Sequence, residues 1–109
     1  MTMSVMSLTD DAFALEVLQS EVPVLFDFWA PWCGPCRRMS PIVDEVSAEL
    51  GDRARVVKVN VDEARATAVR YGITSIPSFA VFYGGEVQQR FRGVVPKDRL
   101  LEALNPHLP

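Results

Sequence analysis

Apolar residues along this chain recur with two different periods, which together predict alternating strands and helices. Residues 23–30 read PVLFDFWA, and an apolar run of this length, broken by one aspartate, is typical of a strand covered on both faces. From Pro35 to Leu50 apolar side chains recur every three or four residues, as on one face of a helix. Gly51 is placed to end that helix, and Pro41 is expected to kink it.

Three shorter patterns predict further elements in the first two thirds of the chain. An edge strand is expected at residues 4–6, followed by a helix from an N-cap at Thr9 to about Gln19. Residues 55–61 alternate as a strand, and residues 63–71 form a short helix.

The last third of the chain carries a hairpin signal. Strand patterns at 78–83 and 86–92 flank Gly84-Gly85, a two-residue loop typical of antiparallel pairing. A final helix is expected from Pro96 to about Leu104. Strands that alternate with helices need parallel crossovers, whereas the hairpin is antiparallel, so the pattern predicts an α/β fold with a mixed sheet. No repeat or linker divides the chain, and we expect residues 1–109 to form one domain.

Charge and composition narrow the function. The chain has 14 acidic and 11 basic side chains, and a net charge of −3 gives no footprint for nucleic acid. The first residues lack the basic and apolar regions of a signal peptide, and no run approaches the roughly 20 apolar residues that span a bilayer. We therefore expect a soluble cytoplasmic protein that binds neither nucleic acid nor membrane.

The two cysteines of the chain, Cys33 and Cys36, lie in the segment WCGPC, where the buried strand meets the long helix. This position places Cys33 at a helix N-terminus, which favours an anion, so Cys33 is expected to ionise more easily. Cys36 lies one turn further in, where we expect it to be shielded, and is close enough to form a disulfide with Cys33. The pair is therefore expected to alternate between dithiol and disulfide.

The next two residues, Arg37 and Arg38, place positive charge where a first helical turn usually carries acidic side chains. One interpretation is that these charges stabilise the thiolate. The other, which remains open here, is that both are solvated surface residues.

A Cys-x-x-Cys pair is also half of a typical zinc site. Structural zinc needs four ligands, and the chain adds only one histidine, His107, which we expect to be an exposed residue of the C-terminal tail. We therefore predict no metal. Two unreactive core cysteines are disfavoured as well, because Gly34-Pro35 and the preceding tryptophan are typical of an exposed turn.

Asp27 is the one charged residue in the buried strand, six residues before Cys33. Burial raises the pKa of an unpaired carboxyl, so Asp27 is placed to exchange a proton when Cys36 reacts. Lys58 on the following strand is a candidate charge partner. The alternatives are that Asp27 is a structural carboxyl hydrogen-bonded to backbone and that Lys58 is an ordinary lysine at a strand edge.

Together these motifs resemble the thioredoxin family. The resemblance rests on FDFWAPWCGPC at 26–36, KVNVD at 58–62, YGITSIPSFAVFYGG at 71–85 and FRGV at 91–94, in that order over essentially the whole chain. It implies a thioredoxin fold, with a central mixed five-stranded sheet flanked by four helices.

The resemblance also implies roles for single residues. Cys33 corresponds to the nucleophile, Cys36 to the resolving thiol, Asp27 to the proton acceptor with Lys58 nearby, and Pro77 to a cis proline that faces the cysteines. A groove that binds substrate proteins is implied at Trp32, Gly34, Pro35, Ile76, Pro77, Gly93 and Val94. Three positions depart from the family pattern, and they leave the choice of targets open: Pro31, Arg37 and Ser78.

The resemblance implies a general protein-disulfide reductase whose only redox group is the Cys33–Cys36 disulfide, with no bound cofactor. Its partners would be disulfide-containing substrate proteins and an NADPH-dependent flavoprotein, thioredoxin reductase, and we expect a monomer. An oxidase or isomerase is disfavoured by Gly34-Pro35 between the cysteines. A binding or assembly module with incidental redox turnover remains the alternative.

Overall fold

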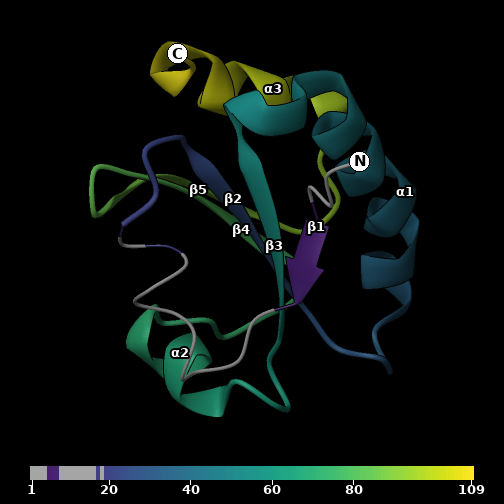
Figure 1. Cartoon of the computed structure of the whole chain (residues 1–109). Coiled ribbons are helices and arrows are strands. Elements are labelled where there is room, and N and C mark those ends of the chain that lie inside the picture. The colour runs from purple at the N-terminus through teal and green to yellow at the C-terminus, as the bar shows by residue number, and fades with distance from the viewer. Residues whose placement is uncertain (1–4, 8–16, 18) are drawn as a thin grey trace.

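A mixed sheet forms the centre of the molecule in the computed structural model of the chain, which describes residues 5–7, 17 and 19–109 (Figure 1). Its strands lie in the order β1-β3-β2-β4-β5. Strands β1, β3 and β2 are parallel, whereas β4 is antiparallel to β2, and β5 to β4, which confirms the predicted mixed sheet. The strands are β1 (Val5–Ser7), β2 (Val24–Trp29), β3 (Arg55–Asn60), β4 (Ser78–Tyr83) and β5 (Glu86–Arg92).

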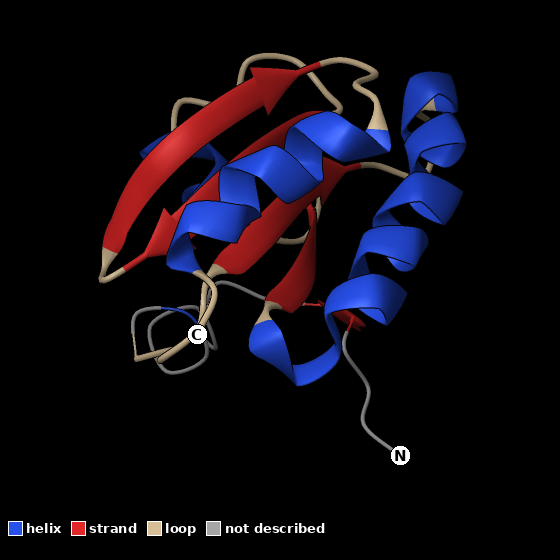
Figure 2. Cartoon of the chain, turned by 90° about the horizontal axis from the view of Figure 1, so that it is seen from above, coloured by secondary structure: helices blue, strands red, loops and turns tan. Residues whose placement is uncertain are grey.

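Helices cover both faces of this sheet (Figure 2). The described residues contain three α-helices, α1 (Gly34–Leu50), α2 (Arg65–Arg70) and α3 (Lys97–Leu104), and two single 3₁₀ turns at Gly51–Arg53 and Asn105–His107. Thus three of the four expected helices are seen, and α2 is shorter than the predicted 63–71. The remaining one, expected from Thr9 to about Gln19, falls almost wholly outside the described residues.

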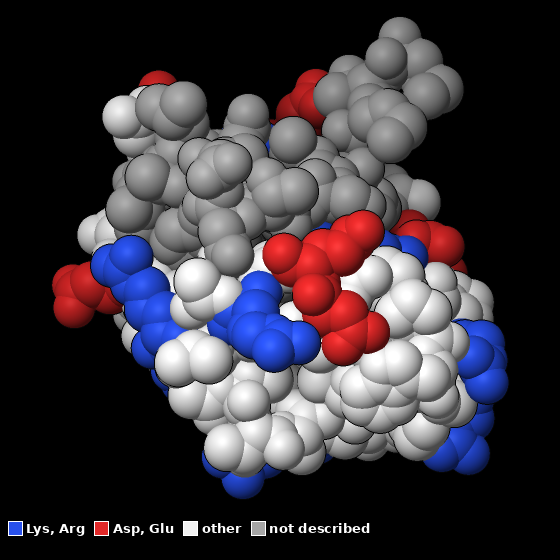
Figure 3. Space-filling model, turned by 90° about the horizontal axis from the view of Figure 1, so that it is seen from below, with Lys and Arg blue, Asp and Glu red and all other residues white. Residues whose placement is uncertain are grey.

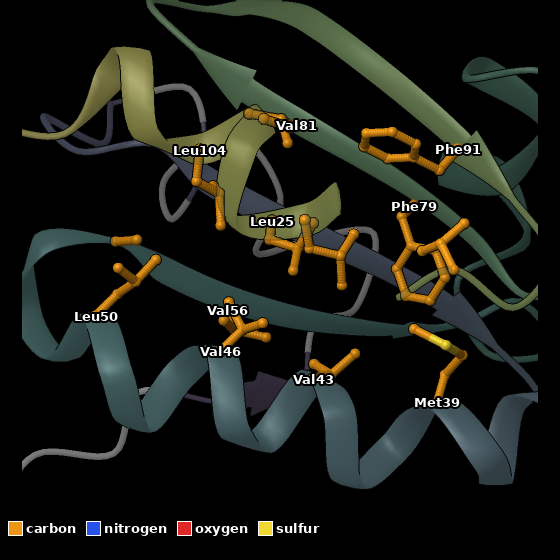
Figure 4. Packing of buried hydrophobic residues seen from close by; sticks show 14 residues of the cluster. Leu25, Met39, Val43, Val46, Leu50, Val56, Phe79, Val81, Phe91 and Leu104 are labelled. Atoms are coloured by element: carbon orange, nitrogen blue, oxygen red, sulfur yellow. The ribbon is translucent and has the colours of Figure 1, made fainter. Parts of the chain in front are cut away.

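The α1 and α3 helices pack on one face of the sheet through a continuous apolar core (Figure 4). The predicted helical stripe supplies Met39, Val43 and Val46, all with no exposed surface, and they meet Leu25 and Phe79 of the sheet. Burying one such side chain contributes roughly 1.5–3 kcal/mol, so this face anchors the helix that begins at the cysteines. The helix runs unbroken through its internal proline.

The opposite face of the sheet, toward α2, is aromatic. Phe26 and Phe28 of β2 stack edge to face with ring centres 5.7 Å apart, and Phe82 and Tyr71 complete the cluster. Strand β2 is therefore buried on both faces, as its apolar run predicts. Asp27 lies in the middle of this strand, and the alternation of side chains turns it toward α1.

The β4–β5 hairpin closes as predicted. Tyr83 pairs with Glu86, so the loop is the two residues Gly84 and Gly85, with φ of 64° and 83°. Two successive positive φ angles are what a type I′ turn requires, and glycine adopts them without a steric penalty.

The face of the molecule seen from below carries basic and acidic side chains that lie next to each other near its centre, with uncharged surface below them (Figure 3). Within the part of the chain that the structure describes, no helix is both long enough and apolar enough to cross a bilayer.

Candidate active site

The site forms where β2 turns into α1. The backbone N–H of Cys33 donates to the carbonyl of Ala30 at 3.1 Å, which closes the turn, and α1 begins at the next residue, Gly34. Cys33 is thus the N-cap of α1, and its Sγ accepts the backbone N–H of Cys36 at 3.2 Å. The two sulfurs form a disulfide. The predicted placement of Cys33 at a helix N-terminus is confirmed, and its sulfur already occupies the position of a capping acceptor.

Both cysteines are covered although the turn around them is exposed. Cys33 is 5% exposed and Cys36 6%, whereas the side chain of Trp32 is 68% exposed. Cys36 is shielded as predicted, but exposure does not distinguish the two sulfurs in the disulfide form. The difference between them lies in their position on α1, because only the Cys33 sulfur caps the helix.

The guanidinium of Arg37 donates to the carbonyl of Pro31 at 2.8 Å. It therefore braces the turn that carries Trp32 and Cys33, a role that neither interpretation from the sequence included. Arg38 is exposed. Of the two arginines, Arg37 therefore has its positive charge bound next to the start of α1.

A cavity of about 230 Å³ lies behind the disulfide, between β2, β3 and the start of α1. Cys36 and Asp27 both line it, so the predicted proton acceptor and the second thiol share one space. The Oδ1 of Asp27 and the indole N–H of Trp29 are buried there with no hydrogen-bond partner among the described residues. Polar groups of this kind are usually satisfied by water, which a cavity of this size can hold.

The environment of Asp27 shifts its ionisation. Its side chain is only 3% exposed, and this burial raises the pKa of Asp27 from 3.8 to about 6, against the opposing positive charge of Lys58 and with a small further rise from Asp44. A carboxyl with this pKa takes up and releases protons near neutral pH.

Lys58 is opposite Asp27 in the parallel register of β2 and β3, so the backbone places it where a charge partner of Asp27 could lie. Its ammonium nevertheless bonds elsewhere: Nζ donates to Oγ of Ser40 at 3.1 Å and lies 3.5 Å from Oδ1 of Asp44. Sequence reasoning missed Ser40 and Asp44. Their spacing of four and eight residues from Cys36, on a predicted helix, was the available signal.

On the other side of the site, Trp32 and Ile76 line an open apolar pocket of about 330 Å³, with Val61 and Ile73. The indole N–H of Trp32 donates to Oδ2 of Asp62 at 3.0 Å, which fixes the exposed ring. Sequence reasoning assigned Asp62 to a motif but gave it no role.

Two loops meet next to this pocket. The Ile76–Pro77 peptide bond is cis, as the resemblance implied, and the N–H of Gly93 donates to the carbonyl of Pro77 at 2.8 Å. Ser78 donates its hydroxyl to the carbonyl of Ser75 at 2.6 Å. Val94 is 50% exposed. The expected groove residues from these two loops are therefore adjacent, while the orientation of Pro77 toward the cysteines stays a prediction.

The histidine considered as a zinc ligand is not an exposed tail residue. The ring of His107 is half-buried and stacks on Tyr83 with ring centres 5.0 Å apart, because a 3₁₀ turn folds the chain end over the hairpin. Among the described residues no three acidic, histidine or cysteine side chains are grouped as metal ligands would be.

Comparison with known proteins agrees with this geometry. The sequence model described as thioredoxin matches residues 4–106. Thioredoxin 1 of Synechococcus elongatus is 50% identical over 102 residues, which cover 94% of this chain and 95% of that protein. The thioredoxin of Bacillus subtilis is 45% identical over 106 residues, 97% of this chain and all of that protein. The chloroplastic M-type thioredoxin of Chlamydomonas reinhardtii is 47% identical over 94% of this chain and 73% of its own length.

Proposed function

Because this chain belongs to the thioredoxin family, we propose that its individual site residues divide the work of disulfide exchange as described below. The family and the redox-active cysteine pair make the chain a protein-disulfide oxidoreductase that acts as a disulfide reductase. One observation carries the assignment of roles: Cys33 Sγ caps α1 and accepts the Cys36 N–H.

In the reduced protein, the thiolate of Cys33 attacks one sulfur of a substrate disulfide. A bond forms between Cys33 and that sulfur, and the other substrate sulfur leaves as a thiolate. Cys36, as a thiolate, then attacks the sulfur of Cys33, forms the Cys33–Cys36 disulfide and releases the second substrate sulfur. The substrate gains two electrons and the cysteine pair loses them.

Cys36 must lose its proton before the second step, and Asp27 is the proposed acceptor. Support comes from the cavity that both side chains line and from the raised pKa of the Asp27 carboxyl, whose Oδ1 has no partner among the described residues. The acceptor then passes its proton to the departing substrate thiolate. Lys58, on the neighbouring strand, tunes this carboxyl through its charge.

We propose that substrate proteins dock in the groove formed by two exposed apolar side chains and the loops between them. Trp32 and Val94 are exposed although large and apolar, which is typical of a surface that a partner covers. The remaining groove residues are Gly34, Pro35, Ile76, Pro77 and Gly93.

The proposed electron donor is an NADPH-dependent flavoprotein, thioredoxin reductase. The test mixes the oxidised protein with a bacterial thioredoxin reductase, NADPH and insulin, and follows NADPH oxidation. Turnover is expected for the parent, and loss of turnover for Cys33→Ser and Cys36→Ser. Reduction of insulin by the dithiothreitol-reduced protein, measured without the reductase, separates the two assignments. If that reaction proceeds while NADPH is not consumed, the donor is wrong and the reductase activity stands.

A binding module would behave differently. Its partner would be retained equally by the parent and by a Cys33→Ser, Cys36→Ser double variant, since no thiol takes part. A Cys36→Ser single variant, in contrast, is expected to trap substrates as mixed disulfides with Cys33, which release on addition of dithiothreitol.

The remaining features of the proposal concern the whole chain. We propose that it acts as a single-domain monomer in the cytoplasm, with the disulfide as its redox centre and no bound cofactor. Confinement of both cysteines to the redox motif supports a reducing compartment.

A further inference from the structure

One line of side chains along α1 connects the active site with the outer edge of the cavity. Cys36, Ser40 and Asp44 follow one another at intervals of four residues, so they lie on the same face of the helix. Cys36 and Ser40 line the cavity, and Asp44 is further along the helix, where its side chain is 59% exposed.

Lys58 reaches this line from β3. Parallel register places its backbone beside that of Asp27, and both side chains project toward α1. The ammonium has two acceptors on the helix, Oγ of Ser40 at 3.1 Å and Oδ1 of Asp44 at 3.5 Å. Asp27, its neighbour in register, keeps an unpartnered Oδ1.

We propose that Ser40 is a positioning residue: with Asp44, its hydroxyl holds the Lys58 ammonium against α1 and prevents an ion pair with Asp27. Without these two acceptors, the buried aspartate and the lysine on the adjacent strand would be expected to form an ion pair, because the pair offsets the desolvation of both charges. The inference rests on the proposed role of Asp27 as proton acceptor, because an ion pair with Lys58 would lower the pKa of the carboxyl away from neutral pH.

The surroundings of Asp27 leave Lys58 as the decisive charge. Among the described residues the charges that act on it are Lys58 from β3 and Asp44 from α1, and its partner on β4 is the apolar Phe79. The other charged residue that lines the cavity is Arg37, and Cys36, which also lines it, is held in the disulfide. Arg37 is already bonded to a backbone carbonyl. Burial is the largest influence on the pKa of Asp27, and movement of Lys58 toward the carboxylate would lower this pKa further.

The test measures the Asp27 carboxyl directly. Carbon-13 NMR of the oxidised protein, titrated between pH 4 and 9, gives the pKa of Asp27 without any turnover. We expect Ser40→Ala to lower this pKa by roughly 0.5 or more, because Lys58 loses one of its two acceptors on α1 and approaches the carboxylate. Ser40→Thr keeps the hydroxyl and is expected to titrate like the parent.

A second background shows whether the effect passes through the lysine. In Lys58→Met the ammonium is absent, so adding Ser40→Ala is expected to leave the titration of Asp27 unchanged. An unchanged pKa in Ser40→Ala alone overturns the proposal. So does an equal decrease in the Lys58→Met background, because the hydroxyl would then act on Asp27 without the lysine.

Exchange kinetics distinguish this inference from the function on which it rests. If Asp27 carries the proton, the pH profile for reduction of insulin by reduced Ser40→Ala shifts to lower pH by the same amount as the pKa. A pKa that moves while the rate profile stays fixed supports the positioning role of Ser40 and refutes Asp27 as the proton acceptor.

Discussion

Gly93 and Pro77 are joined by a backbone hydrogen bond of 2.8 Å, in which the N–H of Gly93 donates to the carbonyl of Pro77. Gly93 follows β5 and Pro77 precedes β4, so this bond ties together the ends of the two hairpin strands nearest the cysteines. This bond therefore holds together the two loops that carry Pro77 and Gly93 in the proposed docking groove.

Gly93 adopts a φ of 78°, which an L side chain rarely adopts. We expect Gly93→Ala to reduce the free energy of unfolding by about 1 kcal/mol and to raise KM for insulin more than it changes kcat. The reason is that relaxing the strain shifts the backbone next to Pro77. Urea denaturation and steady-state kinetics measure the two effects.

The matched control is Gly84→Ala, whose φ of 64° imposes the same strain in the hairpin loop. It is expected to lose similar stability with KM unchanged. A rise in KM of equal size in both variants would show that general destabilisation, and not the groove, weakens substrate binding.

The Asp27 carboxyl makes stability depend on pH. Its pKa rises from 3.8 to about 6 on folding, so the unfolded chain ionises first as pH increases. Ionised Asp27 therefore destabilises the folded state relative to the unfolded chain. This effect is absent below about pH 4, grows between pH 4 and 6, and reaches roughly 3 kcal/mol above pH 6. Asp27→Asn should gain roughly 2 to 3 kcal/mol over the parent at pH 8 and almost nothing at pH 4, measured by urea denaturation of the oxidised protein. A gain that is equal at both pH values would assign the effect to packing.

The capping position of Cys33 leads to a prediction for the reduced protein. Iodoacetamide at neutral pH is expected to modify Cys33 well before Cys36, because the N-terminus of α1 stabilises the Cys33 thiolate. Peptide mapping by mass spectrometry after short exposure measures the ratio. Equal labelling would remove the basis for calling Cys33 the nucleophile.

Pro35 occupies the exposed first turn of α1 and supplies no N–H and no charge to the Cys33 sulfur. A protonated histidine at this position would stabilise the thiolate and thus the dithiol form. We expect Pro35→His to raise the reduction potential by tens of millivolts, where about 30 mV corresponds to roughly 1.4 kcal/mol. Equilibration against glutathione buffers measures it, and a potential that is unchanged or lower would make Pro35 a purely structural residue.

The elements of the fold were predictable where one local rule acted alone. The bounds of the hairpin strands at 78–83 and 86–92 match the structure residue for residue, because Gly84-Gly85 fixes the turn. A register shift between Val81 and Phe82 changes the pairing further from the loop, and no sequence pattern indicated it. Boundaries moved by one or two residues where caps compete. The short helix begins at Arg65 and not at Glu63, since a turn after β3 takes up the intervening residues.

The site was predictable as far as each residue carried its own signal. Cys33, Asp27 and Pro77 were singled out because a motif, a misplaced charge or the family pattern marks them. The structure shows the helix-cap position of Cys33, the cavity beside Asp27 and the cis bond before Pro77, while the roles of these residues stay predictions. The bond from Lys58 to Ser40 was not, because it depends on where a flexible side chain finds its acceptor across two elements. The stacking of His107 on Tyr83 likewise needs the path of the chain end.

Two separate hollows adjoin the segment that carries the disulfide, one lined by Cys36 and the other by Trp32. The pocket beside Trp32 is lined by one set of side chains, and the cavity beside Cys36 by another, with no residue in common. If the proposed roles of the two regions hold, substitutions in the pocket would change the recognition of partners without altering the acid–base chemistry in the cavity, and the reverse. With this arrangement, substitutions on one side of the cysteines would change which partner proteins are bound, while the residues that carry out the reaction stay the same.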